Sequence, residues 1–274
     1  MSDPTGVTNA TGSEPLHHEA EYRVRFDEAG PDGLLRTSGF LRYAQDVAWL
    51  HSTALGFDRD WYRERGLTWL VRAAELEVLR PIPMGTAIVS RTWVVGQRRV
   101  LARRRGEFRM ADGSLAGWVH TDWVMIDARG LLTRIPAVFG EVFRIPETTG
   151  QIGRVALPPT PGSASERSFT VRPHELDPMD HVNNAVYVDW LEEAVLATST
   201  GGTAGPRDAS AARAGTLLDA MPRRYRLEYA MALDAGASLR DAVWREGDGW
   251  AYRVTSTDGG DAFRAICESG GGDR

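Results

Sequence analysis

The sequence contains no lysine, a single cysteine and no long apolar run. All 32 basic residues are arginine, which excludes a Schiff-base lysine and the lysine of a Walker-type phosphate loop. Cys267 has no second cysteine to pair with, so no disulfide can form within the chain and a reducing compartment is expected. No apolar segment is long enough to cross a bilayer, so we expect no membrane span. These absences favour a cytoplasmic protein.

Charge and histidine spacing argue against two further classes of protein. A net charge of −5 provides no general basic surface for nucleic acid. The six histidines are scattered and have no His/Cys spacing that suits zinc, so we expect no metal site.

Glycine-rich stretches lack the strand-to-helix context of a dinucleotide-binding motif, so no cofactor is expected. Residues 1–20 have neither a basic start nor an apolar segment, which predicts a flexible tail without a secretory signal.

One pattern of secondary structure occurs twice along the chain. A short alternating strand, a loop, a long helix and several antiparallel strands are expected at 21–145 and again at 168–270. Apolar spacing predicts the helices at about 38–55 and 184–198. The proline-containing segment 146–167 is a predicted linker. One long helix per antiparallel sheet, present twice, predicts an α+β fold.

The most informative motif lies just before the second predicted helix. It contains Asp177, His181, Asn183, Asn184 and Tyr187 in fixed spacing. The segment resembles the Asp-x-x-x-His-Val-Asn-Asn-x-x-Tyr signature of hotdog thioesterases, especially acyl-ACP thioesterases. The N-terminal half resembles the same family at Tyr22–Phe26, Leu41–Ala48, His51, Leu55-Gly56, Trp69–Arg72, Pro81, Gly85 and Thr92-Trp93.

The resemblance implies two tandem hotdog units, each a curved antiparallel sheet wrapped around one long helix. It also implies hydrolysis of a thioester carried by acyl carrier protein or by CoA. Two such units in one chain would replace the usual homodimer, which leaves open whether the chain associates further.

The residue types in the motif suit thioester hydrolysis. A carboxylate at Asp177 can polarise water or attack the carbonyl directly. The helix start near Asn184 offers backbone N–H groups and the positive end of the helix dipole to a developing oxyanion. The resemblance gives Asp177 and His181 catalytic roles and makes Asn183 and Asn184 residues that position the oxyanion and the substrate.

Three positions depart from the plant-type members of the family. Met179 stands where those enzymes have an asparagine, and Ala232 and Leu233 stand where they have a Glu-Cys pair. We therefore expect a minimal mechanism that uses the loop aspartate and the helix N-terminus. The departures also keep a catalytically silent acyl-binding protein open as an alternative.

Simpler interpretations exist for several of these residues. An aspartate before a helix is most often a cap or turn residue, and His181 alone could be structural. The first unit has no matching aspartate–histidine loop, so we expect it to be scaffold and acyl pocket, lined in part by Trp69 and Trp93. The arginines at 98–99 and 103–105 fit either a docking patch for an acidic carrier or an exposed strand face.

Overall fold

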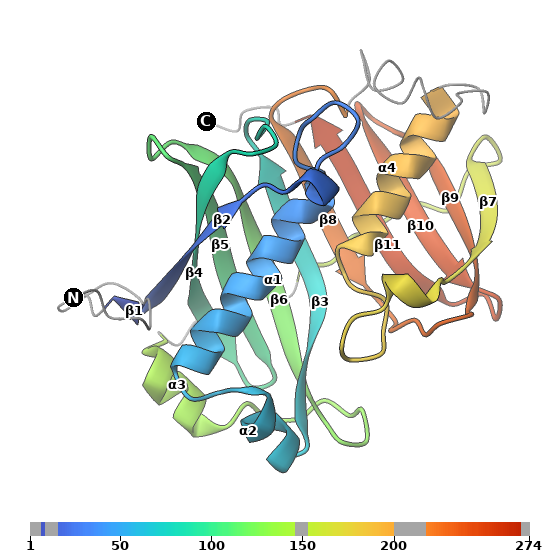
Figure 1. Ribbon diagram of the computed structural model, residues 1–274. Coiled ribbons are helices and arrows are strands. Elements are labelled where there is room, and N and C mark those ends of the chain that lie inside the picture. Colours follow the sequence, from blue (N-terminus) through green and yellow to red (C-terminus); the bar gives the residue numbers. More distant parts are fainter. Residues whose placement is uncertain (1–6, 9–15, 146–152, 200–217, 270–274) are drawn as a thin grey trace.

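The computed structural model of the chain describes residues 7–8, 16–145, 153–199 and 218–269 (Figure 1). These residues form one 11-stranded sheet in which every strand pair is antiparallel. Two long helices lie on one face of this sheet. In the part of the chain that the structure describes, neither they nor the shorter helices have the length and apolar character needed to cross a membrane.

The N-terminal unit contains a strand, a long helix and then four more strands. The long helix is α1, Thr37–Ala54. The strands are β2 (His17–Arg23), β3 (Leu67–Val78), β4 (Ala87–Arg98), β5 (Leu101–Met110) and β6 (Leu115–Asp127). Shorter elements are β1 (Val7–Thr8), a 3-10 turn (Phe26–Glu28), α2 (Arg59–Glu64) and α3 (Ala137–Phe143). The spatial order of the five main strands is β2-β4-β5-β6-β3.

The C-terminal unit repeats this arrangement. Its long helix is α4, Val186–Ser199. Its strands are β7 (Ser165–Thr170), β8 (Arg223–Tyr229), β9 (Ser238–Glu246), β10 (Gly249–Ser256) and β11 (Asp261–Ser269), with a 3-10 turn at Pro173–Glu175. Their spatial order, β7-β9-β10-β11-β8, is the order found in the first unit. The predicted α+β fold of two units, each with one long helix on an antiparallel sheet, is confirmed.

The two sheets are joined into one through β3 and β8. These strands occupy equivalent places in their units and pair antiparallel, with Leu76 opposite Tyr225. Because equivalent strands pair in opposite directions, the two units are related by an approximate two-fold axis. The pairing also removes two sheet edges that would otherwise be open to other chains.

Both long helices cover the same face of the joined sheet (Figure 1). Strand β3 shows how the sequence determines that face, because side chains alternate along a strand. Leu76 and Val78 point into the core, whereas Glu75 and Glu77 occupy the alternate positions and are only partly buried. The helices contact each other through an ion pair of 3.1 Å between Arg42 and Asp189. One hydrophobic core therefore extends through both units.

Helix ends and unit boundaries differ from the predicted ones in detail. Helix α1 ends at Ala54, and Gly56, directly after the C-cap Leu55, has a φ of +85° that suits the predicted helix stop. Helix α4 begins at Val186, so Asn184 precedes it. The first long strand begins at His17, which places 17–20, predicted as part of the tail, in the sheet. This part of β2 was not predicted because it is rich in histidine and glutamate. It belongs to the sheet through its backbone hydrogen bonds with β4. Residues 165–167 of the predicted linker belong to β7.

Candidate active site

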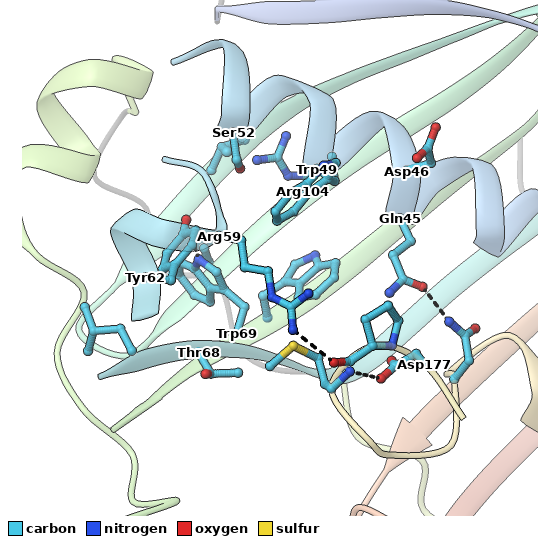
Figure 2. A pocket seen from close by; sticks show the side chains of 18 of the residues that line it. Gln45, Asp46, Trp49, Ser52, Arg59, Tyr62, Thr68, Trp69, Arg104 and Asp177 are labelled. Carbon is cyan, nitrogen blue, oxygen red and sulfur yellow. Dashed lines mark hydrogen bonds between the residues drawn. The ribbon is translucent and has the colours of Figure 1, made fainter. Parts of the chain in front are cut away.

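A cavity of about 700 Å³ is lined mainly by the N-terminal unit and by the loop that precedes α4 (Figure 2). Its wall includes Gln45 and Trp49 of α1, Tyr62 of α2, Trp69 of β3, Arg104 of β5, Trp123 of β6 and Asp177 of the loop. A second cavity of about 200 Å³ adjoins the same loop on the side of the C-terminal unit. Among the residues that the structure describes, Asp177 is the one titratable side chain that lines both cavities.

The loop at 177–181 is a tight turn held by its own backbone. The N–H of Asp177 donates to the carbonyl of His181 at 2.8 Å, and the N–H of Asp180 donates to the carbonyl of Asp177 at 2.9 Å. Asp180 adopts a left-handed φ of 64°, which aspartate tolerates. One carboxylate oxygen of Asp177 accepts from the N–H of Met179 at 2.8 Å. Asp177 is thus a turn residue, as the simpler interpretation holds, and its half-buried carboxylate also faces the cavities.

Asn183 connects the start of α4 to the first long helix. Its side-chain oxygen accepts from the N–H of Ala185 at 3.0 Å, which caps the helix. Its amide nitrogen donates to Oε1 of Gln45 at 3.1 Å, a bond drawn in Figure 2. Asn183 therefore joins the two units at the cavity.

The backbone N–H of Asn184 is a candidate donor to an oxyanion. The N–H of Val182 is bonded to Leu233 and that of Asn183 to Glu175, each at 2.9 Å. The next N–H, that of Asn184, has no hydrogen-bond acceptor among the described residues. Asn184 lines the smaller cavity and lies just before a helix N-terminus, where partial positive charge stabilises anions.

His181 lies at the smaller cavity but does not bond to the Asp177 carboxylate. Its Nδ1 is 3.0 Å from Oδ1 of Asp234, and the imidazole is 40% exposed. The structure therefore places His181 beside the site in contact with a different carboxylate. That geometry suits proton transfer to and from a group in the smaller cavity better than orientation of Asp177.

The two tryptophans predicted to line the acyl pocket lie on opposite sides of the sheet: one lines the cavities and the other does not. Trp69 lines both cavities, and its indole N–H donates to the hydroxyl of Tyr62 at 3.0 Å. Trp93 lines neither cavity, so its assignment to the pocket is wrong. The reason is the alternation along β4, where Thr92 and Val94 face inward and Trp93 lies on the outer face beneath Arg91, 5.5 Å from its guanidinium carbon.

The three positions that depart from the plant-type pattern lie in the loop or next to it. Met179 is 46% exposed and lines both cavities. Ala232 lines the smaller one, and Leu233 is buried with its carbonyl bonded to Val182. None of these side chains can transfer a proton. Cys267 lines neither cavity, and burial raises the pKa of its thiol, so it is not a nucleophile for this site.

The arginine run at 103–105 divides between the two faces of β5. Arg103 and Arg105 lie on the outer face, paired with Asp122 at 2.6 Å and Glu107 at 3.1 Å. Arg104 points inward, is only 8% exposed and lines the larger cavity. The run is therefore neither a free docking patch nor a uniformly exposed face, and the alternation of side chains along a strand was the signal that could have separated its members.

Comparison with known proteins supports a family assignment. Residues 15–143 match the family model of the acyl-ACP thioesterase N-terminal domain, and residues 160–200 match that of the C-terminal domain. The chloroplastic oleoyl-acyl carrier protein thioesterase 1 of Arabidopsis thaliana is 24% identical over 199 residues, which are 66% of this chain and 55% of the relative. The chain spans about half the length of the curated relatives it matches.

Solved structures share the fold over nearly the whole chain. A Lactobacillus plantarum protein provisionally described as an oleoyl thioesterase superposes with a TM-score of 0.79 at 17% identity, covering 94% of this chain and 97% of its own. The 12:0-ACP thioesterase of Umbellularia californica superposes with a TM-score of 0.73 at 21% identity, covering 94% and 98%. At these identities the likeness shows a common fold.

Proposed function

The chain belongs to the acyl-ACP thioesterase family, and we propose that it hydrolyses the thioester of acyl-ACP to a free fatty acid and holo-ACP. The observation that carries this proposal is that Asp177 lines both cavities and shares the smaller one with Asn184, whose N–H has no acceptor among the described residues. A thioester needs a base, an oxyanion donor and a shelter for its acyl chain. All three features meet at this loop.

In this proposal the two cavities hold the two sides of the substrate. The acyl chain occupies the larger cavity of the N-terminal unit, and the arm that carries the thioester sulfur enters through the smaller one. The larger cavity has aromatic walls at Trp49, Trp69 and Trp123, as expected of a site for an apolar chain. The scissile carbonyl then lies where the cavities adjoin, next to Asp177.

The reaction follows from the groups at that point. Water attacks the carbonyl carbon while Asp177 accepts a proton from it, and the N–H of Asn184 donates to the oxygen that becomes negative. Collapse of the tetrahedral intermediate breaks the carbon–sulfur bond and releases a carboxylic acid. The proton then passes to the thiolate sulfur, directly from Asp177 or through His181 at the smaller cavity.

The proposal is tested by free-thiol release from matched acyl-ACP and acyl-CoA substrates of several chain lengths. Faster turnover of the carrier-protein substrates supports it. Faster turnover of acyl-CoA would instead assign the chain to the acyl-CoA thioesterases of the same fold. Binding of acyl chains without hydrolysis of any thioester would favour the silent acyl-binding alternative. The cytoplasmic location and association into a homodimer stay predictions.

A further inference from the structure

The larger cavity is lined by a buried positive charge that has no counter-charge among the described residues. Arg104 is 8% exposed, and its guanidinium bonds to Nδ1 of His51 at 2.9 Å and to Oγ1 of Thr92 at 3.5 Å. Both partners are neutral acceptors. No carboxylate among the described residues forms an ion pair with Arg104.

Several other buried charges in the described chain have ionic partners. Asp122 pairs with Arg103, and Asp241 pairs with Arg167. The second buried arginine, Arg223, reaches a carboxylate through one hydroxyl. Its Nε lies 3.1 Å from the Tyr225 hydroxyl, which donates to Glu192 at 2.6 Å. Arg104 differs from all of them, because its bonds to His51 and Thr92 lead to no carboxylate among the described residues. Burying a charge without a partner is costly.

The groups around Arg104 do not neutralise it. Burial, followed by the positive charge of Arg104, lowers the pKa of His51 to about 2, so this imidazole is neutral. Burial raises the pKa of Tyr62 to about 12, so its hydroxyl is neutral as well. Burial lowers the pKa of Arg104 to about 10, which still leaves the guanidinium charged at neutral pH. The aromatic ring of Phe143, 5.6 Å away, adds only a weak attraction.

The cationic end of the cavity is separate from the catalytic loop. Figure 2 shows Arg104 well separated from Asp177. The distance between the two ends of the cavity can be estimated along helix α1. Gln45 bonds to Asn183 near the catalytic loop, and His51 bonds to Arg104. These two helix positions are about 9 Å apart along the axis. An acyl chain with its thioester at Asp177 can therefore extend toward Arg104.

We propose that Arg104 binds a carboxylate at the distal end of the acyl chain, so that the preferred substrates are thioesters of dicarboxylic acids. This inference rests on the proposed thioesterase function. A guanidinium matches a carboxylate with two parallel hydrogen bonds, and such charge-assisted bonds are strong in a buried site. A chain that ends in a methyl group leaves the cation desolvated and unpaired. Sites built around a polar group discriminate strongly against analogues that lack it.

The test compares thioesters of equal chain length that end in methyl, hydroxyl or carboxylate, all on the same carrier. We expect kcat/KM for the carboxylate-ended substrate to exceed that of the methyl-ended one by about tenfold or more, the effect of one charge-assisted bond. Arg104→Met, which keeps an unbranched apolar stem, should abolish this preference. Arg105→Met is the matched control, because it removes the same charge from the outer face of the same strand and should keep the preference.

Binding measurements keep the inference independent of turnover. Pantetheine amides with the same three chain ends cannot undergo thioester hydrolysis, and their affinities for the wild type and both variants can be measured by calorimetry. Tighter binding of the carboxylate-ended amide that disappears only in Arg104→Met supports the inference, even if no thioester is cleaved. Hydrolysis of methyl-ended thioesters without any preference for the carboxylate would overturn the inference and leave the proposed function intact. A preference for the hydroxyl-ended compound would also overturn it.

Discussion

The side chains of Asn183 and Gln45, 138 positions apart in the sequence, are joined by a hydrogen bond of 3.1 Å at the edge of the cavity. Asn183 also caps the helix that follows the Asp177 loop. Gln45 projects from the helix that forms the opposite wall. Together with the bond from Arg59 to the carbonyl of Pro178, at 3.5 Å, this bond holds the loop against the wall of the larger cavity.

We expect Gln45→Ala to lower kcat by about tenfold, because placement errors far from the chemistry reduce rates without removing a reacting group. KM should change little, since Gln45 holds the loop and is not the main apolar wall. Gln45→Glu keeps an oxygen acceptor for Asn183 and should restore part of the rate. Steady-state kinetics of the three proteins measure this. Loss of kcat in the alanine variant with no recovery in the glutamate variant would contradict a positioning role.

Asp177→Asn should lower kcat by about 10²–10⁴-fold, the usual contribution of a general base. The variant keeps the acceptor oxygen for the N–H of Met179, so the turn and the fold should survive. Circular dichroism and thiol release measure the two properties. Asp180→Asn is the control in the same turn, because that side chain lines neither cavity and asparagine tolerates its φ of 64°. Wild-type turnover by a folded Asp177→Asn protein would refute the assignment.

Much of the fold was predictable because local patterns determine it. The two helical stretches, the glycine that follows the first of them and the strands after each helix all have periodicities that sequence reveals. Joining of the sheets through β3 and β8 was not predictable, since strand partners depend on tertiary structure. The start of α4 was predicted two residues early, because residues 184–185 form a turn between Asn183 and the helix that begins at Val186.

The candidate site was predictable only in part. The spacing from Asp177 to Asn184 identified the loop, and the structure places these residues together at the cavities. Which face of the sheet a strand residue occupies depends on which alternate positions point inward. The sequence did not show this for β4, so Trp93 was assigned to the wrong face. The inward orientation of Arg104 was not predicted, because charged side chains usually point to solvent.

Trp69 should control chain-length preference, because it lines both cavities. Trp69→Ala enlarges the space for the acyl chain, so longer substrates should gain relative to shorter ones. Each additional buried methylene contributes about 0.8 kcal/mol, or about fourfold in kcat/KM. Trp93→Ala removes an equal volume from the outer face of the sheet and should leave the profile of chain lengths unchanged. Identical profiles for the wild type and Trp69→Ala would contradict the proposed location of the acyl chain.

The buried histidine on α1 should make the fold sensitive to mild acid. Burial is the main cause that lowers the pKa of His51 to about 2, against 6.5 for an exposed imidazole. Between these values the unfolded chain binds a proton that the folded protein does not, so the free energy of unfolding falls as the pH drops below 6.5. The slope for one proton is about 1.4 kcal/mol per pH unit, or about 2 kcal/mol between pH 6.5 and 5. His51→Gln keeps an acceptor for Arg104 and cannot titrate, so it should lose about 2 kcal/mol less than the wild type over this interval. Urea unfolding at both pH values measures the difference, and equal losses in the two proteins would show that His51 is protonated in the folded state.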